Sequence, residues 1–196
     1  MLMTTYAGLL RPAPRRQALL YDAVLVTGLS LLIGLSAQVA VRLPFSPVPV
    51  TAQTLAVLLA GLLLGGRRGA LCVLLYLCEG TAGLPVFAGG ASGPVYLLGP
   101  TGGYLLGFVV AAWLVGSLAE RGWDRRSVTT VAAMLLGSAV IYIAGAAWLA
   151  RYVGAERALS LGVYPFIPGD AVKIALAALF VPAGWRAIGH LNRGLR

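Results

Sequence analysis

Long runs of apolar residues alternate with short polar or glycine- and proline-rich stretches along this sequence. A helix of about 20 such residues crosses the hydrocarbon core of a bilayer. Two of the runs are shorter and flanked by glycine, which is tolerated where a membrane segment borders a cavity instead of lipid. The pattern predicts an all-α integral membrane protein of one domain (residues 1–196) with six membrane-spanning helices, at about 22–41, 51–66, 70–82, 101–118, 127–150 and 168–188.

Composition supports the same class. Hydrophobic residues make up 59% of the chain, charged residues 11%, and the mean hydropathy is +0.88. These values are far more apolar than those of a soluble domain. Six spans and their loops also leave no room for a separate soluble catalytic domain, so one domain is expected.

The basic residues gather on one side of the predicted spans. Eleven arginines fall on the side of the two termini, three (Arg42, Arg151 and Arg157) fall on the other, and the single lysine lies within the last span. The positive-inside rule therefore places both termini, including a tail of residues 1–21, in the cytoplasm of a bacterial cell with an inner membrane. The net charge of +9 reflects this orientation, and no nucleic-acid partner is expected.

Two loops on the opposite side are unusual. Residues 42–50 contain three prolines, which predict an extended crossing because proline cannot continue a helix. Residues 83–103 are uncharged and rich in glycine and proline. Such a loop is too apolar for a solvated linker, so we expect it to fold over or into the bundle.

The most informative pair of residues is Asp170 and Lys173, at the start of the last span. Their three-residue spacing places both head groups on one face of a helix. Ionisable groups inside a bilayer are costly unless they pair or meet a polar ligand, which makes them candidates for a small-molecule site facing outward. The alternative is structural: the two pair only with each other, or Asp170 simply favours the helix N-terminus.

Other chemistry is weakly supported. His190 is the only histidine and has no acidic or thiol companion at ligand spacing, so no metal site is expected. Cys72 and Cys78 fit buried structural thiols. An intramembrane enzyme would need a second catalytic group at the depth of Asp170, and an assembly protein would not need the uncharged outer loop. Three acidic residues are expected to be solvated loop charges: Glu120, Asp124 and Glu156.

Several motifs in a fixed order are similar to those of the BioY family, the biotin-specific S components of energy-coupling-factor (ECF) transporters. The resemblance extends over the chain from about residue 23 to residue 188. The motifs are FSPVPVTAQT (residues 45–54), LLAGLLLG (58–65), GLPVFA (83–88), GPTGGY (99–104) and Pro168-Gly169-Asp170 with Lys173.

The resemblance implies a six-helix S-component fold that captures biotin from outside and has no enzymatic activity of its own. It implies partners as well: a membrane coupling protein and two cytoplasmic ATPases, although some members occur without a dedicated ATPase module. S components for other vitamins share this fold, which leaves a different vitamin as the alternative ligand. The small residues of the first span resemble the face on which the coupling protein docks.

The same resemblance assigns site residues. Asp170 and Lys173 would address the polar ends of biotin: a carboxylate suits the ureido N–H groups, and an ammonium suits either the ureido oxygen or the valerate carboxylate. Residues 83–103 would form a lid, with Phe87 and Tyr104 near the fused rings. Gly89 and Gly90 in that lid would allow close approach of the backbone. Glu79 departs from the family pattern and has no assigned role.

Overall fold

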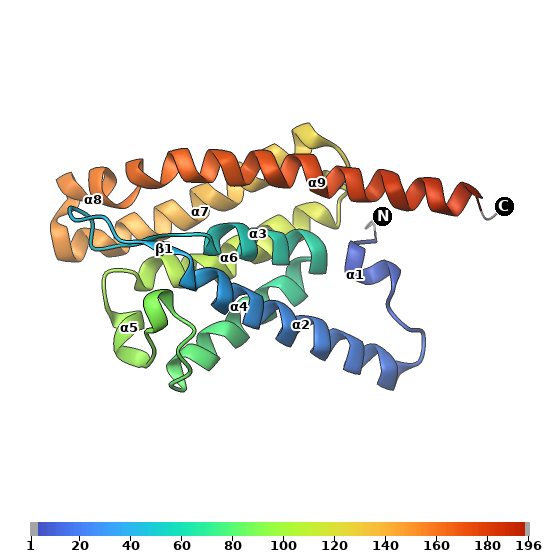
Figure 1. The fold of residues 1–196 in the computed structure, drawn as a ribbon, viewed down its shortest axis with the longest axis horizontal. Helices are drawn as coiled ribbons and strands as arrows, with labels where there is room; N and C mark the ends of the chain where they lie inside the picture. Colours follow the sequence, from blue (N-terminus) through green and yellow to red (C-terminus); the bar gives the residue numbers. More distant parts are fainter. Residues whose placement is uncertain (1–3, 195–196) are drawn as a thin grey trace.

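The computed structural model describes residues 4–194, with side chains to residue 188. Long helices run side by side along one axis (Figure 1). The N-terminal helix and the end of the last helix lie at one end of this bundle, which we call the terminal end; the strands, α5 and α8 lie at the other, which we call the loop end. The elements are α1 (Tyr6–Leu9), α2 (Arg15–Gln38), β1 (Ala40–Val41), β2 (Val50–Thr51), α3 (Gln53–Leu64), α4 (Gly66–Thr81), η1 (Ala88–Gly90), α5 (Pro94–Leu98), α6 (Gly102–Ala119), η2 (Trp123–Arg125), α7 (Ser127–Val153), α8 (Ala155–Gly162), η3 (Tyr164–Phe166) and α9 (Ile167–Gly194).

Within the described residues, 4 helical stretches are long and apolar enough to cross a membrane: α2, α6, α7 and the stretch Ala155–Ile188, which runs from α8 through α9 as far as Ile188. The chain is thus an all-helical, multi-pass membrane protein. The predicted second and third spans are the short helices α3 and α4, of 12 and 16 residues. At 1.5 Å per residue, α3 is only about 18 Å long, well short of a bilayer core of about 30 Å.

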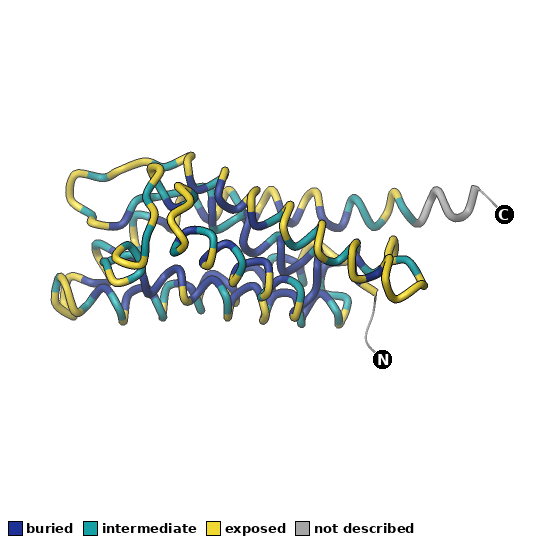
Figure 2. The backbone as a smooth tube through the Cα atoms, turned by 90° about the horizontal axis from the view of Figure 1, so that it is seen from below, coloured by how far each residue is buried: buried dark blue, intermediate teal, exposed yellow. Residues whose placement is uncertain are grey.

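Helix α6 lies at the centre of the bundle and packs against α3, α4 and α7. Small residues allow this close packing. A Cβ atom on Gly116 of α6 would lie 2.4 Å from the backbone of Gly65, and one on Gly61 of α3 would lie 2.5 Å from the carbonyl oxygen of Ala112. Figure 2 shows the buried positions concentrated inside the bundle and the exposed ones along its surface and in its loops.

At the loop end, the proline-rich residues 42–50 connect two short antiparallel strands, with Ala40 opposite Thr51 and Val41 opposite Val50. The segment is not helical, as the prolines predicted, but it forms a hairpin connection that reverses the chain and not an extended crossing. Residues 83–103 fold back against the bundle through η1 and α5. The Gly93 N–H donates to the carbonyl oxygen of Gly80 on α4 (2.8 Å).

The terminal end differs from the simple tail expected from the sequence. Residues 4–14 include the helix α1, and α2 begins at Arg15, before the predicted span. Tyr6 of α1 packs on Trp185 of α9, with ring centroids 4.4 Å apart, and its hydroxyl donates to the carbonyl oxygen of Val181. Arg11 forms an ion pair with Asp22 (2.8 Å), which fastens the connection to α2.

Two expectations about single residues were wrong. Asp124, expected in solvent, is fully buried and accepts a hydrogen bond from the indole N–H of Trp185 (2.6 Å). Cys72 is buried as expected, whereas Cys78 is exposed. The reason is the same in both cases, because chain neighbours do not reveal which face of an element packs against the bundle. The side chain of His190 lies outside the described part of the structure.

Candidate functional site: a polar network beneath an apolar cavity

Asp170 and Lys173 lie at the start of α9 and form an ion pair of 2.7 Å. Their side chains are only 8% and 15% exposed. Helix α9 begins just before them, because the short helix η3 precedes it and Pro168 lies in its first turn, where a proline is tolerated. Asp170 also lies in that first turn, where the helix dipole favours a carboxylate.

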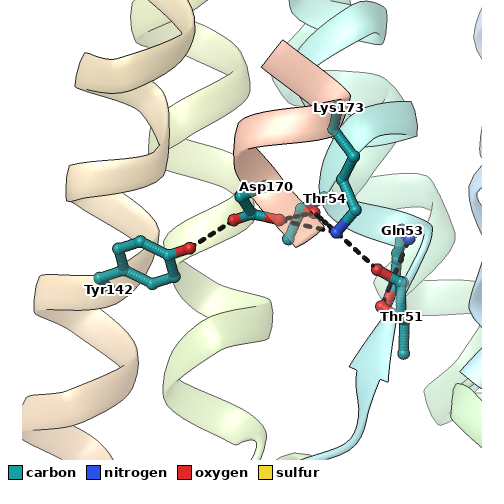
Figure 3. A network of polar contacts seen from close by, with 6 residues as sticks. All are labelled: Thr51, Gln53, Thr54, Tyr142, Asp170 and Lys173. Atoms are coloured by element: carbon teal, nitrogen blue, oxygen red, sulfur yellow. Dashed lines mark hydrogen bonds and ion pairs between the residues drawn. The ribbon is translucent and has the colours of Figure 1, made fainter. Parts of the chain in front are cut away.

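Three residues from other elements complete the network (Figure 3). The hydroxyl of Thr54, on α3, donates to Asp170 Oδ1 (3.0 Å) and accepts from Lys173 Nζ (2.7 Å). Lys173 Nζ also donates to the carbonyl oxygen of Thr51 (2.8 Å), next to α3. The hydroxyl of Tyr142, on α7, donates to Asp170 Oδ2 (2.5 Å). The two charges are thus paired with each other and held by hydrogen bonds from three directions.

This arrangement is what a buried ion pair requires. Two charges removed from water are costly unless good geometry and further hydrogen bonds offset the loss of hydration. Lys173 Nζ has three hydrogens and meets three acceptors, namely Asp170, Thr54 and the carbonyl oxygen of Thr51. The pair is therefore neutral overall and internally satisfied, and it fixes α9 against α3 and α7.

An apolar cavity, which we call the inner cavity, lies next to this network. Thr51, Thr54 and Tyr142 belong both to the network and to the cavity wall. The polar groups are few and lie among aromatic and aliphatic side chains, as is usual for small-molecule sites. The wall consists of Val48, Pro49, Thr51, Gln53, Thr54, Ala88, Tyr96, Thr101, Tyr104, Leu105, Phe108, Ile141, Tyr142 and Phe166.

Tyr104, which the sequence analysis places near the fused rings of a ligand, lines this cavity. Its hydroxyl donates to the carbonyl oxygen of Gly162 (2.7 Å), and the residue is 6% exposed. A Cβ atom on Gly145 would lie 2.2 Å from the ring, so α7 needs glycine there for the ring to fit. The ring is consequently held in one position by α6, α7 and the end of α8.

Phe87, Gly89 and Gly90 lie next to the inner cavity but not in its wall. Phe87 is fully buried, stacked on Tyr96 with ring centroids 4.9 Å apart. Gly89 and Gly90 adopt positive φ values of 72° and 74°, a backbone shape that favours glycine. Between them and Phe87, Ala88 is the residue that reaches the cavity.

Gln38 fastens this turn to the end of α2. Its side-chain oxygen accepts from the Gly90 N–H (2.9 Å), and its side-chain nitrogen donates to the carbonyl oxygens of Gly34 (3.0 Å) and Phe87 (3.2 Å). The segment over the cavity is thus positioned by a residue that the sequence analysis did not single out.

Three further site residues were missed as well. In the sequence, Gln53 and Thr54 stand out only as part of a motif. Two polar side chains at the start of an otherwise apolar helix are nevertheless typical of a polar site in a membrane protein. Tyr142 gave no signal, because it lies in an uncharged run and is 28 residues from Asp170 along the chain.

A second cavity, which we call the vestibule, opens at the loop end. It shares four wall residues with the inner cavity: Pro49, Ala88, Tyr96 and Thr101. The remaining wall comes from residues 42–47 and from the segment 83–103, including Arg42, Ser46, Ser92, Val95 and Gly99. The shared residues make the two cavities neighbours, with the vestibule on the loop-end side of the inner cavity.

The chemistry available at this site is limited by the contacts of its polar groups among the described residues. The described residues contain no group of three or more His, Cys, Asp or Glu side chains that could hold a metal ion. The Asp170 carboxylate is engaged by three donors, so it is poorly placed to take a proton from a substrate. The arrangement suits a small ligand with an apolar body and a compact polar group.

Comparisons with known proteins agree with one another. The sequence model of the BioY family matches residues 11–190. A probable biotin transporter BioY from Pyrococcus horikoshii is 44% identical over 148 residues, which cover 76% of this chain and 86% of the relative. A biotin transporter BioY from Rhizobium etli is 38% identical over 158 residues, covering 76% and 84%.

A solved structure is similar over nearly the whole fold. The crystal structure of an S component for biotin from an ECF-type ABC transporter matches with a TM-score of 0.76 and 25% identity. The match covers 89% of this chain and 95% of that one. The helical arrangement described above is thus that of an ECF S component.

Proposed function

The chain belongs to the BioY family, and from this premise we propose that it is the substrate-capture subunit of a biotin transporter. The observation that supports this most is the inner cavity, whose apolar wall ends at a satisfied polar network. Biotin has the matching shape, with an apolar fused ring bearing a ureido group of two N–H donors and one carbonyl. Capture requires binding only, so no chemistry is assigned to the chain.

The ureido group of biotin would lie at the polar end of the inner cavity. The Gln53 side-chain amide offers a donor and an acceptor there, and its Nε2 is buried with no hydrogen-bond partner among the described residues. The oxygens of Tyr142 and Tyr104 donate their own hydrogens to Asp170 and Gly162, which leaves their lone pairs for ligand N–H groups. Asp170 and Lys173 then act by orienting Tyr142 and Thr54.

The loop end would face the outside and both termini the cytoplasm of the cell, with α3 and α4 completing six crossings. The excess of arginines on the terminal side supports this orientation. In this orientation residues 83–103 form the lid over the inner cavity, with Phe87 as its buried anchor and Gly89 and Gly90 at its tight turn.

Release into the cytoplasm would need energy from partner subunits. We expect a membrane coupling protein and two cytoplasmic ATPases, because the structurally similar S component belongs to an ECF-type ABC transporter. The exposed face of α2 suits such docking: Gly28 has open space where a Cβ atom would point, and Leu31 and Leu35 beside it are exposed.

The test is calorimetry on the detergent-solubilised protein with biotin, thiamine and riboflavin. We expect binding of biotin alone, at one molecule per chain. Asp170→Asn should weaken biotin binding by at least about tenfold, since it disturbs the hydrogen bonds that orient Tyr142 and Thr54. Asp124→Asn is the matched control, a buried carboxylate at the terminal end, and it should bind like the parent.

Binding of thiamine or riboflavin instead of biotin would still support a substrate-capture function, but with a different vitamin as the ligand. Binding of none of the three by a folded protein would overturn the proposed function.

A further inference from the structure

The inner cavity does not suit the carboxylate of a ligand. None of the described residues in its wall is charged, and the nearest anion is Asp170, whose hydrogen-bond partner Tyr142 forms part of that wall. The nearest cation, Lys173, has all three hydrogens engaged within the protein. A carboxylate placed here would lose its hydration, meet no free donor from Lys173 and approach a like charge.

The vestibule has the opposite character. Of the described residues in its wall, Arg42 alone is charged. No carboxylate among the described residues forms an ion pair with its guanidinium. A free guanidinium can bind a carboxylate through two parallel hydrogen bonds.

The position of Arg42 is set by the segment 83–103. A Cβ atom on Gly89 would lie 2.6 Å from Arg42 Nη2, so the guanidinium rests against this glycine. Gly89 has a φ of 72°, and the turn around it is fastened by the bond from Gly90 to Gln38. Arg42 thus lies where the chain after β1 meets the turn that covers the inner cavity.

The two cavities are adjacent, because Pro49, Ala88, Tyr96 and Thr101 belong to both walls. A ligand with an apolar ring and a flexible acidic tail would occupy both if its ring lay in the inner cavity and its tail passed the shared residues into the vestibule. Of the two orientations of such a ligand, only the one with its acidic tail in the vestibule places that acid next to Arg42, which has no ion-pair partner among the described residues.

We propose that Arg42 binds the valerate carboxylate of biotin in the vestibule and so determines which way round the ligand enters. This inference rests on the proposed function, and it assigns the carboxylate to Arg42 instead of Lys173. Arg42 therefore selects ligands with an anionic tail, while the inner cavity selects the neutral ureido ring. Biotin methyl ester has the same ring and a neutral tail, and it separates the two contributions.

The experiment measures the affinities of biotin and biotin methyl ester for the full chain, for Arg42→Gln and for Arg42→Lys. We expect Arg42→Gln to weaken biotin by about tenfold, the effect of losing one charge-assisted contact at a partly hydrated site. The methyl ester should bind the parent and Arg42→Gln equally. Arg42→Lys should fall between, because it keeps the charge but not the planar pair of donors.

Arg151→Gln is the matched control. Arg151 is another arginine at the loop end, but it stacks on Trp148 (4.6 Å to the ring centroid) and lies outside the vestibule wall. It should leave both affinities unchanged. Raised salt should weaken biotin binding to the parent more than to Arg42→Gln, because salt screens an exposed charge pair.

Equal losses for biotin and its ester in Arg42→Gln would overturn the inference, and so would no loss for either. In both cases the parent still binds biotin and the proposed function stands. Failure of the parent to bind biotin at all would remove the proposed function and this inference together, so the two failures are distinguishable.

Discussion

Two buried carboxylates occupy opposite ends of this bundle, and their surroundings differ. Asp170, at the loop end, is buried and has a lysine, a threonine and a tyrosine as partners. Asp124, toward the terminal end, is fully buried and bonds to Trp185, while its Oδ1 has no partner among the described residues. Burial of an acid is therefore no sign of a site in itself.

The difference lies in what the partners touch. The partners of Asp170 include Thr54 and Tyr142, which form part of a cavity wall. The partner of Asp124 packs instead against α1, since Trp185 lies against Tyr6 and beneath the guanidinium of Arg125 (4.2 Å to the ring centroid). One carboxylate orders the wall of a binding site, and the other fastens the N-terminal helix to α9.

The largest expected effect is the loss of stability when the buried carboxylate of Asp170 loses its counter-ion. Lys173→Met should lower the free energy of unfolding by about 3–5 kcal/mol, because it leaves the buried charge of Asp170 without a counter-ion. The double variant Asp170→Asn/Lys173→Met should recover most of that loss, since neither charge remains. Asp124→Asn should cost only about 1 kcal/mol, as the amide oxygen can still accept from Trp185. Thermal or denaturant unfolding in detergent measures all three.

A double variant as unstable as Lys173→Met would contradict the ion-pair explanation. Its loss would then have to come from packing of the lysine stem against α3.

A smaller effect separates binding from stability. Gln53→Met should lower biotin affinity by about tenfold, the cost of one lost hydrogen-bonding group. It should leave the unfolding midpoint unchanged or raise it slightly, because Gln53 Nε2 has no hydrogen-bond partner among the described residues. Calorimetry and thermal unfolding of the same preparation test both statements.

Ser138→Ala is the control for Gln53→Met. The Ser138 hydroxyl is likewise buried without a partner among the described residues; it borders a small void beside Asp170 and Lys173 but lies outside the inner cavity wall. It should change neither affinity nor stability measurably. Reduced affinity in Ser138→Ala as well would mean that binding responds to general repacking and not to Gln53 in particular.

The smallest expected effect is a pH dependence at the terminal end. Burial raises the pKa of Asp124 above its usual value, and the hydrogen bond from Trp185 opposes this increase. A raised pKa in the folded state means that protonation favours folding. The protonated carboxyl of Asp124 therefore stabilises the fold below its unfolded pKa, near 4. This contribution should be lost as pH rises through the folded pKa of Asp124.

The measurement is the unfolding midpoint of the parent minus that of Asp124→Asn, followed from pH 4 upward. The difference should decline as pH rises and then level off, while titration of the other carboxylates cancels. A difference that increases with pH would contradict the assigned direction of the pKa shift.

The sequence predicted those features that depend on near neighbours. Asp170 and Lys173 share a helix face because they are three residues apart, and the prolines of residues 42–50 exclude a helix. The order of the helices also followed from the apolar runs. Each of these features is set by local geometry or by bilayer thickness, which leave few alternatives.

Features that depend on contacts between distant segments were not predictable. Tyr142 donates a hydrogen bond to Asp170 from a helix whose sequence shows no polar pattern. Phe87 packs against Tyr96 and does not line the inner cavity. Asp124 was expected in solvent because its neighbours are charged, yet the fold places it against Trp185. The sequence also does not reveal that Thr51 and Thr54 accept two of the three hydrogens of the Lys173 ammonium.

The central claim is that biotin binds in the inner cavity with its ureido group toward the network of Asp170 and Lys173. The most direct test is a crystal or cryo-electron microscopy structure of the protein with biotin bound. The account predicts density for the fused rings between Tyr104 and Tyr142, with the ureido group within hydrogen-bonding distance of Gln53 or Tyr142. Rings outside this cavity, or a carboxylate in contact with Lys173, would contradict it.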